Sequence, residues 1–189
     1  MQYRYISGDS HLEIDSKHWL DRVPAKYRDY APRLVRQANG SDTWMIGDQI
    51  KRAAAAADLY GGKGRDAYVP FDGRYEGTPG TGSAAQRVSE QDRDGIDAEV
   101  LFPSQQGGPK FWRRVEDNEA YKAVLRAYNS WLVEEYCAVN PDRLIGVGIL
   151  PLGVALDDVI AELEFCAQSG FKTVLLQAHP SGNAYASAA

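Results

Sequence analysis

Cysteine and long apolar runs are scarce in this sequence, and their scarcity excludes several classes of protein. Only two cysteines are present, Cys137 and Cys166, and they lack metal-ligand spacing. Both fall inside helical patterns, so we expect reduced, buried thiols and a reducing compartment. No stretch approaches about 18 consecutive apolar residues, so we predict no membrane-spanning segment. The N-terminus lacks the basic and apolar regions of a signal peptide, and we therefore expect a cytoplasmic protein.

The sequence also has no excess of basic over acidic residues. The chain has 21 basic and 26 acidic residues, a net charge of -5, and this gives no electrostatic case for nucleic-acid binding. The remaining composition is that of an ordinary globular protein, with 44% hydrophobic and 25% charged residues. A length of 189 residues suffices for one domain with a substantial core.

The first candidate site lies near the start of the chain. A β-prone run over residues 3–6 passes through Gly8 into Asp9 and His11. Residues i and i+2 of an extended strand point to the same side, so these two side chains can face one point beyond a strand end. A carboxylate oxygen and an imidazole nitrogen that converge in this way suit a divalent ion such as zinc or manganese. Taken alone, Asp-x-His is more often a turn cap beside a surface histidine.

Residues 12–83 follow no regular pattern, and we interpret them as an insertion. Asn39-Gly40 is a strong turn signal between two short predicted strands, which would form a small antiparallel flap (residues 34–35 and 43–46). The alanine run 53–57 predicts one or two turns of helix. Residues 61–82 are rich in glycine, proline and polar side chains, and they predict a long loop.

The pattern becomes regular over residues 84–180. Strands that are apolar throughout alternate with single amphipathic helices, which indicates parallel strands covered by helices and joined by right-handed crossovers. We predict strands at residues 98–102, 144–150 and 173–177, a helix that ends at Gly95, and helices over 116–139 and 155–169.

Five segments together resemble a known family. They are residues 7–11 (SGDSH), 94–103 (DGIDAEVLFP), 129–132 (NSWL), 140–147 (NPDRLIGV) and 150–152 (LPL). In this order and spacing the chain resembles the amidohydrolase-related family, in the group of aminocarboxymuconate-semialdehyde decarboxylase and γ-resorcylate decarboxylase. The resemblance implies a distorted (β/α)8 barrel that holds one divalent metal, zinc or manganese, at the C-terminal ends of its strands. The family's first two ligands form His-x-His or Glu-x-His after strand one. Asp9 and His11 occupy those places, and the aspartate departs from both forms.

The other end of the chain departs further from the family. The remaining ligands of the family are a histidine after strand five and an aspartate after strand eight, whereas we predict only four parallel strands here. A complete barrel needs about 250 residues. We therefore interpret residues 1–189 as the N-terminal half of a metal-dependent (β/α)8 TIM barrel, an α/β fold with a long insertion after strand one. His179 follows strand four, so the family pattern does not make it a ligand. We predict that Ser104 and His179 are substrate-binding residues, with a plain loop histidine as the alternative for His179.

The resemblance implies a non-oxidative decarboxylase of a small aromatic or dienoate carboxylate. A metal-dependent hydrolase of an ester, lactone or amide is the alternative within the family. The rival from another class is an inactive half-barrel that pairs its open strand edge with a second copy as a homodimer. Because the sequence supplies two recognisable ligands, we expect the 189-residue chain alone to bind zinc or manganese weakly and to turn over no substrate.

Overall fold

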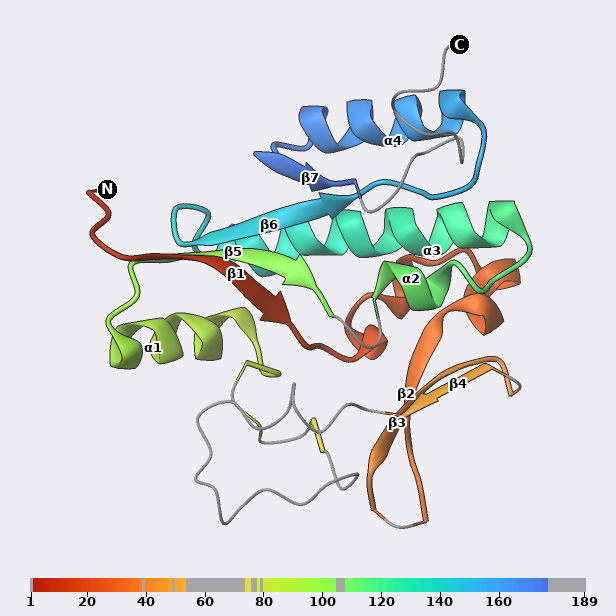
Figure 1. Ribbon diagram of the computed structural model, residues 1–189, viewed down its shortest axis with the longest axis horizontal. Coiled ribbons are helices and arrows are strands. Elements are labelled where there is room, and N and C mark those ends of the chain that lie inside the picture. Colours follow the sequence, from red (N-terminus) through yellow and green to blue (C-terminus); the bar gives the residue numbers. More distant parts are fainter. Residues whose placement is uncertain are drawn as a thin grey trace.

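The computed structural model describes residues 2–38, 40–48, 50–53, 74–75, 78, 80–104 and 108–176, with the backbone alone at 50–53. Two sheets organise these residues (Figure 1). The larger sheet is parallel, in the order β1(Ile6–Leu12), β5(Ala98–Pro103), β6(Leu144–Ile149) and β7(Thr173–Leu175). The strand order and the parallel direction that the sequence predicts are confirmed.

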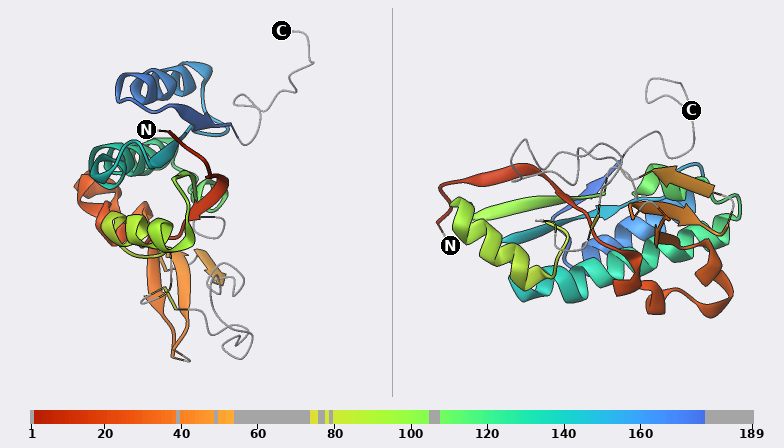
Figure 2. Two further views of the ribbon diagram at one scale, coloured as in Figure 1. Left: turned by 90° about the vertical axis from the view of Figure 1, so that its left-hand side faces the viewer. Right: turned by 90° about the horizontal axis from the view of Figure 1, so that it is seen from below.

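Four α-helices accompany this sheet: α1(Ala84–Asp94), α2(Pro109–Trp112), α3(Asn118–Trp131) and α4(Leu156–Gln168). The longer three lie along one side of the parallel strands (Figure 2). Local sequence sets their ends: Ser83 and Asp117 accept hydrogen bonds from the first turns of α1 and α3, and Gly95 closes α1 at a φ of 71°. The predicted helix 116–139 is α3 followed by a π turn, Leu132–Tyr136, and a 3-10 turn, Cys137–Val139.

Tight packing between the strands and the helices explains the glycines of β6. A Cβ at Gly146 would stand 2.9 Å from Cys137 Sγ, and a Cβ at Gly148 would stand 2.9 Å from Cys166 Sγ. Both cysteines are buried, as predicted, and each fills the space that a glycine leaves on the helix side of the strand. The helices therefore lie close against β6.

The smaller sheet is antiparallel and comes from the predicted insertion. Its strands are β2(Pro32–Arg36), β3(Asp42–Ile46) and β4(Ile50–Ala53), in that order. The predicted flap is confirmed. Ala53 ends β4, so the helix predicted to begin there is wrong at this residue, and residues 54–57 lie outside the described part of the chain. Most of the predicted loop 61–82 lies outside it as well.

The segment between β1 and β2 contains three short 3-10 helices, Ser16–His18, Leu20–Arg22 and Ala25–Tyr30. The sequence predicts one short helix here, with Asp15 and Ser16 at its cap and its end before Pro24. Asp15 does accept from the amide of Lys17, but so short a segment gains too few α-helical hydrogen bonds to pass beyond single turns. No helix in the described residues is long and apolar enough to cross a membrane.

Candidate functional site

Asp9 and His11 lie side by side within β1, of which Asp9 is the middle residue, and so not beyond the strand end as the sequence predicts. Asp9 Oδ1 and His11 Nε2 are 3.7 Å apart, and the exposed fractions of their side chains are 88% and 28%. Two ligands of a tetrahedral zinc ion lie about 3.3 Å apart, so a shift of roughly 0.4 Å would bring these atoms to ligand spacing. The two side chains face the same side of β1, as the alternation along an extended strand predicts.

The backbone of β5 fixes which nitrogen of His11 faces Asp9. His11 Nδ1 lies 3.0 Å from the carbonyl oxygen of Pro103. A carbonyl only accepts hydrogen bonds, so Nδ1 carries the proton and donates it. In the neutral ring, Nε2 then holds the lone pair, and Nε2 is the nitrogen beside Asp9. The ring of Phe102 lies 6.1 Å from that of His11 and completes its surroundings on β5.

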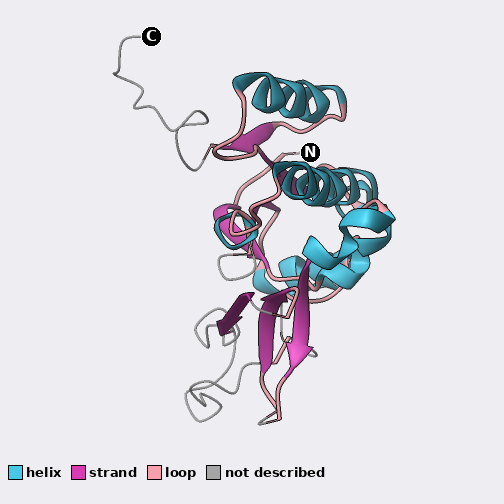
Figure 3. Cartoon of the chain, turned by 90° about the vertical axis from the view of Figure 1, so that its right-hand side faces the viewer, coloured by secondary structure: helices cyan, strands magenta, loops and turns pink. Residues whose placement is uncertain are grey.

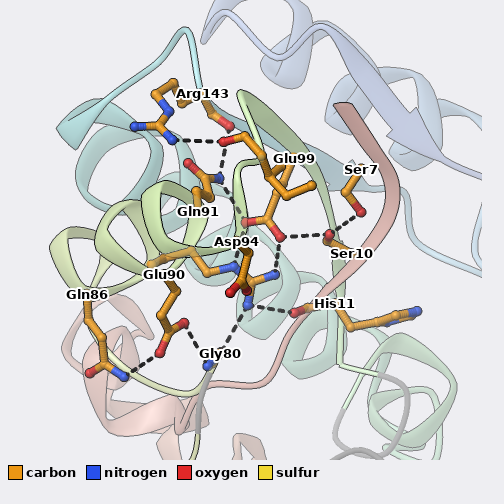
Figure 4. Close-up of polar contacts among 12 residues, drawn as sticks. Ser7, Ser10, His11, Gly80, Gln86, Glu90, Gln91, Asp94, Glu99 and Arg143 are labelled. Atoms are coloured by element: carbon orange, nitrogen blue, oxygen red, sulfur yellow. Dashed lines mark hydrogen bonds and ion pairs between the residues drawn. The ribbon is translucent and has the colours of Figure 1, made fainter. Parts of the chain in front are cut away.

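The opposite side of β1 carries a separate polar cluster. Ser10 donates to Glu99 at 2.9 Å, and Arg87 of α1 pairs with the same carboxylate at 2.6 Å. Figure 4 shows Ser10 turned towards Glu99, whereas the imidazole of His11 points away from the cluster. Burial would raise the pKa of Glu99, but hydrogen bonds from Arg87, Gln91 and Ser10 hold this pKa below its usual value. The Glu99 cluster therefore joins α1 to the sheet, and the Asp9–His11 pair faces the other way.

Ser104 follows β5 and is directed at a buried carboxylate. Its hydroxyl donates to Glu13 Oε2 at 2.6 Å, and the hydroxyl of Tyr75 donates to the same oxygen at 3.0 Å. All three side chains are buried, with exposed fractions of 9% for Ser104, 5% for Glu13 and 4% for Tyr75. The substrate-binding role of Ser104 stays a prediction. His179 lies outside the described residues, and its predicted role stays a prediction too.

Sequence reasoning missed Glu13 and Tyr75. Glu13 stands two residues after His11, and this continued i, i+2 spacing was the one local signal for it. The partners of Glu13 are 62 and 91 residues away in the chain, so no spacing rule connects them. Tyr75 is one of the aromatic residues of the predicted loop 61–82, and no pattern there distinguishes it.

The donor set fits two positions of a divalent metal site. A fixed imidazole tautomer and a carboxylate suit zinc or manganese. In the part of the chain that the structure describes, no group of three or more His, Cys, Asp or Glu side chains could hold a metal ion. The described residues therefore supply two candidate ligands, Asp9 and His11.

A cleft of about 340 Å³ lies between the 3-10 segment, the smaller sheet and the start of α1. Its lining includes Lys17, His18, Arg36, Tyr75 and Gln86, but neither Asp9 nor His11. Because the two candidate ligands lie elsewhere, we do not assign the chemistry to this cleft. Figure 3 shows the molecule from the C-terminal ends of the parallel strands, with the smaller sheet below them.

Comparisons with known proteins find similarity in structure alone. No family model and no curated protein sequence matches the chain. A solved amidohydrolase from Mycobacterium avium subsp. paratuberculosis aligns with a TM-score of 0.66 at 21% identity, over 92% of this chain and 49% of that one. IDCase from Metarhizium anisopliae aligns with a TM-score of 0.58 at 17% identity, over 94% and 43%. For 5-carboxyvanillate decarboxylase from Sphingomonas paucimobilis, the TM-score is 0.51 at 19% identity, over 94% and 44%.

These similarities establish the fold. The chain spans less than half the length of each of these three solved structures. Its parallel sheet and covering helices match part of each, which agrees with part of a barrel. The resemblance that the sequence predicts is therefore confirmed for the fold, and the chain has the architecture of part of a barrel.

Proposed function

We propose that Asp9 and His11 are two ligands of a divalent-metal site, zinc or manganese, in a non-oxidative decarboxylase of small aromatic or dienoate carboxylates. The observation that carries the proposal is the pair itself. A carboxylate oxygen and the lone-pair nitrogen of a tautomer-fixed imidazole stand 3.7 Å apart on a parallel strand, with His11 next to its C-terminal residue, Leu12. In barrel folds, that end of the strands collects the catalytic residues.

The solved structures with the same fold support the class of reaction. One of them is named as a decarboxylase of 5-carboxyvanillate, which is an aromatic carboxylate. In such a reaction, the bond between a carbon atom and its carboxylate breaks, carbon dioxide leaves, and a proton takes the vacated place on carbon. A bound divalent ion would supply positive charge to orient the anionic substrate and stabilise the charge that develops on it.

The residues of this chain have distinct parts in that scheme. Asp9 presents an exposed carboxylate, and Pro103 holds His11 through Nδ1 so that Nε2 faces Asp9. Ser104 and His179 remain proposed substrate contacts, with Ser104 placed at the C-terminal edge of the sheet. Further ligands must come from outside the described residues, because these hold no cluster of three.

We also propose that the 189-residue chain alone binds metal weakly, turns over no substrate and forms a homodimer. Two ligands hold zinc less tightly than the three or more of a catalytic site. In the described sheet, β7 is an outer strand, and α4 beside it exposes Leu156, Ile160 and Leu163. An apolar surface next to an open strand edge favours pairing with a second copy. Light scattering of the purified chain tests the homodimer.

Calorimetric titration of the chain with zinc tests the metal site. We expect weak binding by the unmodified chain, a loss of affinity of about tenfold or more in His11→Ala, and no change in His18→Ala. His18 is the matched control, since it is an exposed histidine on a 3-10 turn away from the pair. Equal affinities in all three proteins would contradict the proposal. Carbon dioxide release from γ-resorcylate by the chain alone would contradict the predicted lack of turnover.

A further inference from the structure

Glu13 is a buried carboxylate at the edge of the sheet that carries the candidate ligands. Its Oε2 accepts from Ser104 at 2.6 Å and from Tyr75 at 3.0 Å. Hydrogen bonds to a charged acceptor are among the stronger ones in proteins, and a buried carboxylate is costly without them. The burial of all three side chains shows that this contact is part of the packed structure.

The bond between Glu13 and Ser104 ties two strand ends together. Backbone pairing of β1 with β5 stops at Leu12 and Pro103, and Glu13 and Ser104 are the next residues on each strand. Pro103 is also the residue whose carbonyl receives the Nδ1 proton of His11. The carboxylate–hydroxyl bond therefore holds the carbonyl of Pro103 at the place where it selects the tautomer of His11.

The second partner, Tyr75, joins Glu13 to the smaller sheet. The hydroxyl of Tyr75 accepts from Trp44 Nε1 at 2.8 Å, and the amide of Tyr75 donates to Asp42 at 2.9 Å. Both Trp44 and Asp42 are buried residues of β3. Tyr75 therefore receives a hydrogen bond from β3 and gives one to Glu13.

The protonation state of Tyr75 keeps this direction fixed. Burial, followed by the charge on Glu13, raises the pKa of the phenol far above its usual value. The hydroxyl thus remains protonated, and its one proton goes to the carboxylate. Near neutral pH, the hydroxyl of Tyr75 therefore always donates to Glu13 and accepts from Trp44.

We propose that Glu13 is a positioning residue that fixes the tautomer of His11 through Ser104 and Pro103, and that docks β3 at the strand ends through Tyr75. The importance of the tautomer for metal binding rests on the proposed function, whereas the tautomer itself and the docking of β3 do not. Both can therefore be measured in the metal-free chain.

The test uses nitrogen NMR of the histidine rings and amide hydrogen exchange, both without metal. In the unmodified chain, we expect His11 to be protonated at Nδ1. In Glu13→Met, which removes the acceptor, and in Ser104→Ala, the ring should shift towards the Nε2–H form that neutral histidine favours in water. Ser104→Thr, which keeps the hydroxyl, should retain Nδ1–H. Tyr75→Phe should leave the tautomer unchanged but speed amide exchange in β3 by about tenfold or more.

Glu13→Met should also speed exchange in β3, and combining it with Tyr75→Phe should add little, since both changes break the same link. Tyr121→Phe is the matched control, because this buried tyrosine bonds the amide of Leu152 instead. In Tyr121→Phe, the tautomer of His11 and the rate of amide exchange in β3 should equal those of the unmodified chain. An unchanged tautomer in Glu13→Met and Ser104→Ala, or unchanged exchange in Tyr75→Phe, would overturn the proposal. Failure of zinc binding alone would overturn only the proposed function.

Discussion

The two ends of the parallel sheet use their polar side chains differently. At the N-terminal end, Asp97 accepts hydrogen bonds from the amides of Arg4 and Tyr5, and Arg143 donates to the carbonyls of Ile96 and Asp97. These side chains satisfy backbone amides and carbonyls where the strands begin. At the C-terminal end, the carboxylate of Asp9 is largely exposed and faces the imidazole of His11.

The difference separates stability from function. Arg143 satisfies two partly buried backbone carbonyls, and its removal would leave them without their donor. The exposed carboxylate of Asp9 can be replaced at little cost to folding, because an exposed ion pair adds little stability. The polar side chains at the N-terminal end therefore stabilise the sheet. At the C-terminal end the buried Glu13–Ser104 bond also does so, whereas the exposed Asp9 beside His11 belongs to the pair that we propose binds a metal.

The largest expected effect lies between the two ends, at the buried pair of Arg87 and Glu99. Both side chains are only 11% exposed, and their atoms are 2.6 Å apart. Arg87→Met leaves the carboxylate without its cation, and we expect a loss of about 3–5 kcal/mol in the free energy of unfolding, measured with urea. The exposed pair of Arg93 with Asp94 provides the control, since Arg93→Met should leave stability unchanged. A small loss in Arg87→Met would show that this cluster does not hold α1 on the sheet.

The same pair should make stability depend on pH. Burial alone would raise the pKa of Glu99, but its donors lower this pKa in the folded chain. The unfolded chain therefore binds the proton at higher pH, and the stabilisation is present above the unfolded pKa and lost as pH falls through the folded one. In Glu99→Gln this contribution is absent. The difference in stability between the two proteins should be full at neutral pH and shrink below about pH 4.5; a constant difference down to acid pH would contradict the account.

At the N-terminal end, Arg143→Met should cost somewhat less. The variant loses the hydrogen bonds to Ile96 and Asp97 and the ion pair with Asp92. We expect about 2–3 kcal/mol, because two backbone carbonyls lose a charged donor. Zinc affinity should remain that of the unmodified chain. A loss of zinc affinity in Arg143→Met, at a temperature where this variant is folded, would show that the N-terminal end also affects metal binding.

The smallest effect on stability is expected at the C-terminal end. Asp9→Asn keeps the shape of a highly exposed side chain, so the free energy of unfolding should change by no more than about 0.5 kcal/mol. The affinity for zinc should nevertheless fall, since an amide is a poorer ligand than a carboxylate. Marked destabilisation in Asp9→Asn would assign the residue to the fold rather than to a site.

Much of the fold follows from local patterns in the sequence. The apolar strands, the cap at Gly95 and the turn at Asn39-Gly40 are set by residues close in the chain, and they were predicted. The spacing of Asp9 and His11 also predicted their shared side of β1. Two of the segments that carry the resemblance, residues 94–103 and 140–147, contain Asp97 and Arg143. The structure shows what these two residues do: Arg143 donates to the carbonyl of Asp97 across 46 positions at the N-terminal end of the sheet.

The rest depended on contacts that no local pattern encodes. The short helix α2 contains two large buried aromatic residues, Phe111 and Trp112, and tertiary packing holds it in place. The link from Glu13 to Tyr75 is possible only after the insertion has folded back on the strand ends. The local pattern therefore predicts a role for His11 but not for Glu13, two residues later.

One measurement tests the central claim that ligand chemistry belongs to the C-terminal end of the sheet alone. Nitrogen and amide NMR spectra of the chain, recorded during a titration with zinc, report on both ends at once. We predict that Nε2 of His11 and the amides around Asp9 shift, that Nδ1 of His11 stays protonated, and that Tyr5, Asp97 and Arg143 are unaffected. Shifts centred on Asp97 and Arg143, or at His18 with none at His11, would contradict the account.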